Sequence, residues 1–239
     1  MNNYKKSYSP GDLEGPGNSP YRQEWNMGGL EGPQEPKVSE GPENSFSWKL
    51  DETFCLRIYG KGNMPSWSDA HQVPWYGIRD KIRFAVVNSG ITDVGDCAFQ
   101  GCKTLTGVIL ANSITRIGSQ AFEDCTSLAE VILPGNVISI GRETFRSCTA
   151  LTRISISEGV TSIGTSAFSH CSSLTSVTLP KSLEYVGPDL FKKCRNLTRV
   201  TMPSSFNKWI YAVEMVAGNA VATTFKDIFG IRRNKVTFI

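Results

Sequence analysis

Cysteine is the reactive residue type that stands out in this chain of 239 residues, because five of its seven cysteines are spaced 23 residues apart. Thiols can form disulfides, ligate zinc or act as nucleophiles. The chain has no Cys-x-x-Cys pair, the spacing from which zinc sites commonly draw their ligands. An odd total also leaves at least one thiol outside any set of internal disulfides. The regularly spaced residues are Cys102, Cys125, Cys148, Cys171 and Cys194, which we call the cysteine ladder.

Histidine is nearly absent, since only His71 and His170 occur and they lie far apart in the sequence. The sequence contains no Gly-x-Ser-x-Gly elbow, phosphate-binding loop, His-Glu-x-x-His motif or dinucleotide fingerprint. We therefore expect no catalytic residues, no metal site and no cofactor, and a protein that is not an enzyme. A hydrolytic pair among the carboxylates is the alternative that stays open.

The cysteines belong to a repeat that also carries glycine, phenylalanine and leucine. Each unit reads G-x-x-x-F-x-x-C-x-x-L-x-x-V-x-L-x-x-x-V-x-x-I, and five units of 23 residues occupy residues 95–209 without an insertion. A fixed period of this length indicates a solenoid, in which each coil buries its apolar positions against its neighbours. Each unit opens with a glycine, for which we expect a positive φ or a close backbone approach.

The two halves of a unit have different patterns. In Leu-x-x-Val-x-Leu, valine and the second leucine lie two residues apart, which predicts a β-strand with both side chains on one face. In Gly-x-x-x-Phe-x-x-Cys the apolar residues are three or four apart, which suits a short helical or 3₁₀ turn. The predicted fold class is therefore an α/β solenoid, with a parallel sheet on one side and short helical or 3₁₀ turns on the other.

This fold predicts the state of the cysteine ladder. Neighbouring rungs lie about 4.8 Å apart, within the Cα separation that disulfides accept. Identical positions project their Cβ atoms in parallel, however, which is poor geometry for an S–S bond. We expect reduced, buried thiols that fill a small apolar slot, because free cysteine is among the most buried residue types.

The repeat resembles the BspA-type leucine-rich repeat family. The matching segments are Ile-Gly-Ser-Gln-Ala-Phe-Glu-Asp-Cys-Thr-Ser-Leu at 117–128, Ile-Gly-Thr-Ser-Ala-Phe-Ser-His-Cys-Ser-Ser-Leu at 163–174 and Val-Thr-Leu-Pro at 177–180. Here the cysteine precedes the strand, whereas the commoner leucine-rich pattern places Asn or Cys after it. The resemblance implies a leucine-rich repeat solenoid that binds proteins, often at a microbial surface, with host matrix or neighbouring cells as partners. It also implies a surface or secreted location, although residues 1–10 lack the apolar segment of a secretory signal.

The repeats divide the chain into four predicted parts. Residues 1–45 hold seven glycines and six prolines and are expected to form a disordered tail. Residues 46–94 resemble the N-terminal cap of the family, and residues 82–87 within them are expected to add a sixth strand. Five repeats follow at 95–209, and residues 210–239 are expected to form a C-terminal cap, since a solenoid must cover its last apolar layer.

The variable positions of the strands point to a candidate binding surface. The residue between the last two apolar positions is apolar in the first three strands and polar in the next three, namely Val86, Ile109, Ile132, Ser155, Thr178 and Thr201. We expect an exposed apolar stripe of Phe84, Val86, Ile109 and Ile132, with Arg153 at its margin. Contiguous exposed apolar residues usually mark a contact site, although β-branched residues are also common on any exposed strand. The expected partner is a protein ligand, or a second copy of the chain in a homo-oligomeric scaffold.

Charge and hydropathy exclude two other classes of partner. The formal net charge is only +3 and the basic residues are not clustered, which argues against a nucleic-acid-binding protein. No run approaches eighteen uncharged apolar residues, so we expect no membrane insertion.

Overall fold

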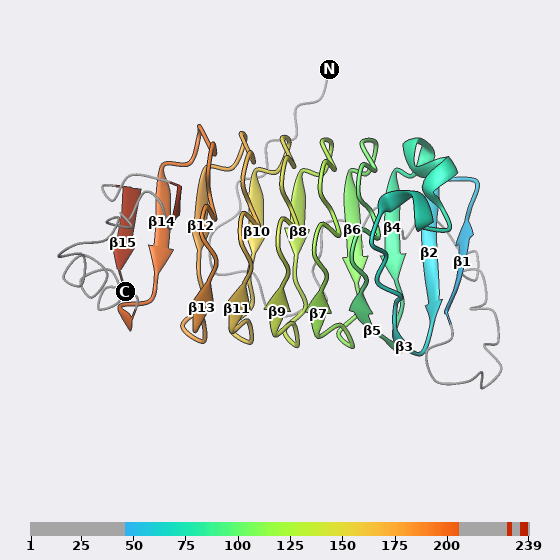
Figure 1. Ribbon diagram of the computed structural model, residues 1–239, viewed down its shortest axis with the longest axis horizontal. Helices are drawn as coiled ribbons and strands as arrows, with labels where there is room; N and C mark the ends of the chain where they lie inside the picture. Colours follow the sequence, from blue (N-terminus) through green and yellow to red (C-terminus); the bar gives the residue numbers. More distant parts are fainter. Residues whose placement is uncertain (1–45, 206–228, 231–234, 239) are drawn as a thin grey trace, which may run out of the picture. The chain divides into compact units, whose positions relative to one another are not determined.

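The computed structural model describes residues 46–205, 229–230 and 235–238, all of which lie in one compact unit (Figure 1). The predicted tail at 1–45 lies outside the described residues, as does most of the predicted C-terminal cap. The described chain is a β-solenoid with little helix, and it has the parallel sheet that the repeat predicted.

One face of the solenoid carries the longer strands, and we call it the main sheet face. Its neighbouring strands are parallel, except for the antiparallel pair β1 and β2 at the N-terminal end. The strands β4 to β14 lie side by side in chain order (Figure 1). The strands are β1 Phe46–Leu50, β2 Cys55–Gly60, β4 Phe84–Val87, β6 Gly107–Leu110, β8 Glu130–Ile132, β10 Arg153–Ser155, β12 Ser176–Thr178, β14 Arg199–Met202 and β15 Val236–Phe238.

A second parallel sheet, which the sequence did not predict, includes the last apolar position of each coil. Its strands are mostly two residues long, so they are too short to produce the alternation by which a strand is recognised in a sequence. Each pairs with the equivalent strand of the next coil, as Ile117 pairs with Ile140. The strands are β3 Gly62–Asn63, β5 Ile91–Val94, β7 Arg116–Ile117, β9 Ser139–Ile140, β11 Ser162–Ile163 and β13 Tyr185–Val186.

The glycine-to-cysteine half of each coil forms turns, and between residues 95 and 203 it contains no helix. The backbone amides alternate between two roles. One amide closes a turn within its own coil, and the next donates to a carbonyl of the following coil. The amide of Cys102 donates to the carbonyl of Phe99 at 3.1 Å, whereas the amide of Phe99 donates to Ala121 at 2.7 Å. Two residues per coil have positive φ, for example Gln120 at 55° and Asp124 at 57°. These left-handed residues interrupt the repeated backbone angles that a 3₁₀ helix requires.

The glycines that open the coils are required by close packing and not by positive φ. The φ of Gly141 is outside the positive region, and the same holds for the equivalent glycines. A Cβ at Gly141 would lie 2.5 Å from the amide nitrogen of Ser119 and 2.6 Å from the carbonyl carbon of Gly118. The glycines therefore let the backbones of successive coils touch. Of the two reasons that we expected for them, only the close approach applies.

A column of parallel phenylalanine rings runs through the core. The centroids of Phe99 and Phe122 are 5.1 Å apart with an interplanar angle of 2°, and each following pair of rings is also stacked. At the N-terminal end Trp75 covers the column, 5.9 Å from Phe99, and its indole N–H donates to the carbonyl of Ala98 at 2.7 Å. Burial of these large rings supplies much of the apolar contact between coils.

At both ends of the solenoid, strands outside the five repeats pair with the main sheet. At the N-terminal end, the 3₁₀ segments η1 Ala70–Gln72 and η2 Tyr76–Lys81 lie between β3 and β4 in the chain. The strand β2 pairs with β4, so the main sheet begins one coil before the strand that we predicted at 82–87. At the C-terminal end Phe229 is buried and its carbonyl accepts the amide of Phe191, while β15 pairs with β14.

Candidate protein-binding surface

The backbone register places the apolar stripe on the outside of the main sheet face. Within β4, Ala85 and Val87 point into the core and Phe84 and Val86 alternate with them. Val86 pairs with Ile109 in the next strand, and Ile132 has the equivalent place in β8. Val86, Ile109 and Ile132 therefore form one column across three coils, and Phe84 lies in the neighbouring column.

The exposed fractions show how much of this stripe meets solvent. Ile109 and Ile132 are each 42% exposed, whereas Phe84 and Val86 are half-buried. The core neighbour Val131 is 1% exposed and Leu133 is 3% exposed. Ile109 and Ile132 can thus be changed without removing an inward-facing side chain.

The column changes character at β10. Ile132 pairs with Ser155, and Thr178 pairs with Thr201 in the last two repeats. Arg153, which is exposed, pairs with Glu130 in the column that begins with Phe84. The column that contains Val86 is therefore apolar over β4 to β8 and polar over β10 to β14, and Arg153 lies beside this boundary in the neighbouring column.

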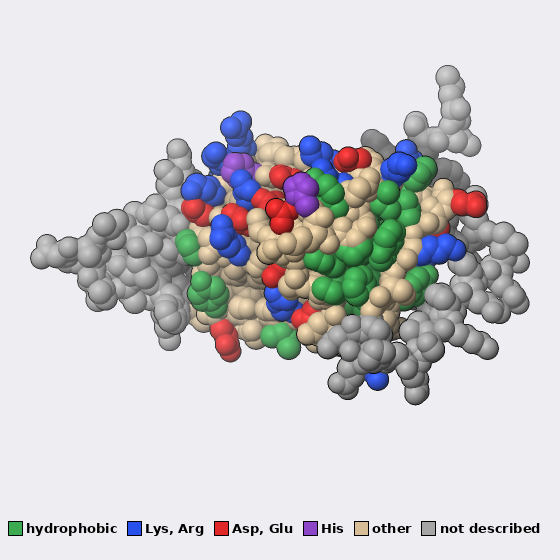
Figure 2. All heavy atoms as spheres, turned by 45° about the vertical axis from the view of Figure 1, so that its right-hand side comes forward, with side chains coloured by type: hydrophobic (Ala, Val, Ile, Leu, Met, Phe, Trp, Pro, Cys, Tyr) green, Lys and Arg blue, Asp and Glu red, His purple; other side chains and the backbone are tan. Residues whose placement is uncertain are grey.

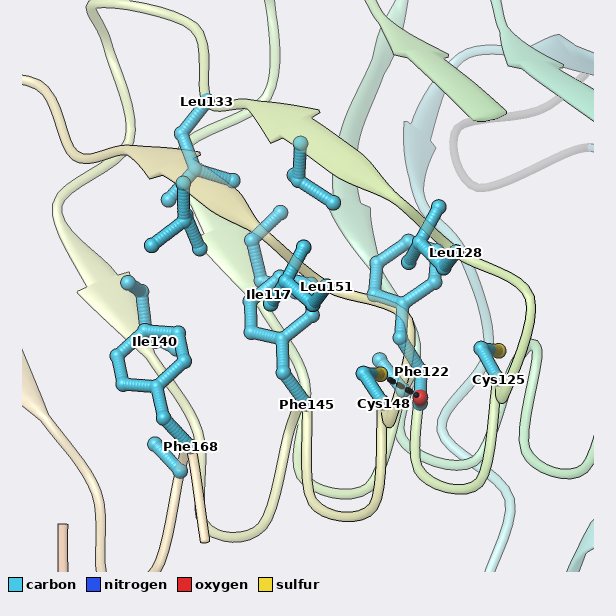
Figure 3. Packing of buried hydrophobic residues seen from close by; sticks show 14 of the residues in the cluster. Ile117, Phe122, Cys125, Leu128, Leu133, Ile140, Phe145, Cys148, Leu151 and Phe168 are labelled. Carbon is cyan, nitrogen blue, oxygen red and sulfur yellow. Dashed lines mark hydrogen bonds between the residues drawn. The ribbon is translucent and has the colours of Figure 1, made fainter. Parts of the chain in front are cut away.

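The cysteine ladder lies in the interior and contributes to the structure rather than to a surface. All seven cysteines are buried and none forms a disulfide. The thiol of Cys148 donates to the carbonyl oxygen of Phe122 in the preceding coil at 3.1 Å, as Figure 3 shows, and three other ladder thiols make the same bond. Burial raises the pKa of Cys102 to about 12 and holds the pKa of Cys125 well above its usual value. Such thiols are poor nucleophiles, because the reactive species is the thiolate.

A buried carboxylate in the turn half escaped the sequence analysis. Glu123 is 3% exposed, although it occupies a variable position of the repeat. Its Oε2 accepts from the side-chain amides of Gln100 at 2.6 Å and Gln120 at 2.7 Å, and its Oε1 pairs with Arg146. Burial opposes the charge of Arg146, but the hydrogen bond and charge of Glu123 outweigh it and raise the pKa of this guanidinium. Every oxygen of this carboxylate has a partner, so the cluster stabilises neighbouring coils.

The two histidines contact different groups. His71 contacts Asp69, with 2.5 Å between Nδ1 and Oδ1, and its ring lies 4.3 Å from that of Tyr76. Burial and the charges of Lys193 and Arg146 lower the pKa of His170. Neither set of contacts includes a nucleophile beside a base. Within the described residues no group of three or more His, Cys, Asp and Glu side chains could hold a metal ion.

Aromatic residues gather at the N-terminal end of the solenoid. Trp48, which is 37% exposed, packs edge-on against Trp75 at 6.0 Å, and Phe46 and Trp67 contact the same indole. Figure 2 brings this end forward and shows a band of hydrophobic side chains on it. These three rings pack on Trp75, which in turn covers Phe99, the first ring of the core column.

None of the helices among the described residues is both long enough and apolar enough to cross a bilayer.

Comparison with solved structures identifies bacterial leucine-rich repeat proteins. A leucine-rich repeat protein from T. pallidum is 27% identical, with a TM-score of 0.52, and the match covers 70% of this chain and 88% of that chain. A leucine-rich repeat protein from Bacteroides ovatus is 25% identical, also with a TM-score of 0.52, over 69% of this chain and 49% of that chain. No curated protein matches the sequence.

The match to a family model agrees with this structural likeness. The model of the BspA type leucine rich repeat region matches six copies over residues 82–212, more than half of the chain. The matched range begins at residue 82, two residues before β4, and therefore includes the strand that precedes the five repeats counted from the glycines. With its solenoid and its buried repeat positions, the chain belongs to the BspA-type leucine-rich repeat family.

Proposed function

We propose that this chain is a non-enzymatic protein-binding module whose partner contacts the apolar stripe. The observation that carries the proposal is the column of Val86, Ile109 and Ile132, which stands outward on three successive strands while the neighbouring positions are buried. Folding does not require isoleucine at these exposed positions, whereas a partner would gain from burying them. The stripe thus differs from the polar continuation of the same column.

The partner class proposed here is a protein of the host matrix or of a neighbouring cell, in an adhesin-like interaction at a cell surface. Membership of the family supports binding of proteins. The T. pallidum and Bacteroides ovatus relatives are themselves bacterial leucine-rich repeat proteins. Arg153 would contact the partner at the margin of the stripe.

The test replaces both exposed isoleucines by arginine, Ile109→Arg with Ile132→Arg. An interface on the stripe would then bury two unpaired charges, a penalty of several kcal/mol that weakens binding at least about tenfold. Binding of the purified chain to immobilised collagen, laminin and fibronectin would be measured by surface plasmon resonance, before and after the substitutions. Equal binding by the wild type and the double variant would contradict the proposal.

The matched control is Thr178→Arg with Thr201→Arg, which adds two arginines to the same column on adjacent strands, away from the stripe. This control variant should bind as the wild type does. Thermal unfolding of both variants would show whether folding survives.

The alternative function is a self-associating scaffold, in which the stripe is buried against a second copy. The same outward column supports it, because a self-complementary apolar patch can form a two-fold interface. Light scattering on the purified chain separates the two functions. A stable monomer contradicts the scaffold, whereas an oligomer that Ile109→Arg with Ile132→Arg dissociates would support it.

A further inference from the structure

The charges that surround the apolar stripe have one predominant sign. In the two outward columns of the main sheet face, the described charged residues are four basic and one acidic. Lys49 and Arg57 lie opposite each other in the register of β1 and β2, at the N-terminal end of the stripe. Arg153 lies in β10, where the polar part of the main sheet face begins. The basic residues are Lys49, Arg57, Arg153 and Arg199, and the acidic residue is Glu130.

Three of these four basic residues make no ion pair with a described residue. Lys49, Arg153 and Arg199 are exposed, and of the four only Arg57 has such a pair. Arg153 pairs with Glu130 in the strand register, but no ion pair joins their side chains. By contrast, Arg57 is held by Asp51, with 3.3 Å between Nε and Oδ2. A partner can therefore supply carboxylates to Arg153 and Arg199.

The spacing of the stripe indicates the conformation of its partner. Side chains on successive strands stand about 4.8 Å apart along the solenoid axis. On an α-helix, residues three or four apart are about 5–6 Å apart, whereas residues on one face of a β-strand are more than 6 Å apart. An apolar face at i, i+3 or i+4, and i+7 thus matches Val86, Ile109 and Ile132 in turn.

We infer that the apolar stripe binds an acidic amphipathic helix, which lies along the solenoid axis and places carboxylates against Arg153 and Arg199. This inference rests on the proposed function and specifies its partner. From Val86 in β4 to Arg199 in β14 there are five strand spacings, about 24 Å, which a helix of about 16 residues covers. Apolar contact holds the helix on the stripe. The cations select a helix with negative charge and determine the direction in which that helix lies.

The test selects displayed random peptides of about 20 residues, slightly longer than this span, on the full-length chain. Peptides that also bind Ile109→Arg with Ile132→Arg are removed. We expect the remaining peptides to carry a net negative charge and apolar residues three or four apart. Their circular dichroism should gain helical signal on binding, and proline at a central position should abolish binding. Raising the salt concentration from about 50 to about 300 mM should weaken the binding of these peptides several-fold, because salt screens charges near the surface.

Charge reversal at the margin isolates the electrostatic part. Arg153→Glu should weaken the selected peptides about threefold or more, whereas Ser176→Glu, one strand further along the same column, should weaken them less. The inference would be overturned if the stripe-dependent peptides were neutral or basic. It would also be overturned if neither salt nor Arg153→Glu changed their affinity. Neither result would contradict the proposed function. A wild-type chain that selects no stripe-dependent peptide would overturn the helix partner alone, since binding to the matrix proteins tests the stripe separately.

Discussion

Gly141→Ala should destabilise the solenoid by about 2–4 kcal/mol, although it adds only one methyl group. The new Cβ would lie 2.5 Å from the Ser119 nitrogen, 0.9 Å closer than the 3.4 Å at which ordinary contact begins. Because the opposing atoms are backbone, the two coils must separate to relieve the clash. Overpacking of this kind costs about 1–3 kcal/mol. Separation also stretches the bond from the Gly141 amide to the Ile117 carbonyl, now 2.9 Å, at about 1 kcal/mol per lost hydrogen bond.

The control is Gly135→Ala, a glycine in the preceding coil with no atom within 4 Å of its added Cβ. Its φ is not positive, so alanine should be neutral or stabilise by about 0.4–1 kcal/mol through the unfolded chain. Equilibrium urea unfolding, followed by circular dichroism, gives both free energies of unfolding. Equal midpoints for the two variants would refute the close-approach explanation of the coil glycines.

Four further experiments test how the coils are built. The cysteine ladder should not react with a thiol reagent in the native state but should react fully in denaturant. Because burial raises the pKa of Cys55 to about 11 and that of Cys102 to about 12, the free energy of unfolding should fall as pH rises from 9 towards 11, where only the unfolded thiols ionise. Arg146→Ala leaves the buried carboxylate of Glu123 without its cation and should cost about 3 kcal/mol by urea unfolding, whereas Arg142→Ala, in an exposed pair, should cost less than about 0.5 kcal/mol. At one repeat position Gly101 has φ of 72° and Lys193 has φ of 62°, so Gly101→Ala should lower the melting temperature and Lys193→Gly should leave it unchanged or raise it.

The proposed binding surface shows which of its features a repeat sequence can predict. The outward column of Val86, Ile109 and Ile132 follows from the period alone, because residues 23 apart stack and a strand alternates its faces. The predominance of positive charge beside it depends on Lys49 and Arg57. Those residues precede the repeats. They come to this face only because β1 pairs with β2 and β2 pairs with β4. No periodicity relates them to Arg153.

The sequence by itself determined the solenoid, the burial of the repeated positions and the family. A hydrophobic position that recurs every 23 residues can be satisfied only by stacking, so the inward set is fully specified. The tertiary structure alone decided the turn half and the second sheet. The first left-handed position of each coil is filled by residues as different as Gln120, Glu143 and Asp189 and in no coil by glycine, so composition does not mark it. These residues adopt positive φ because alternate amides must bond to the next coil, and that requirement exists only once the coils are stacked.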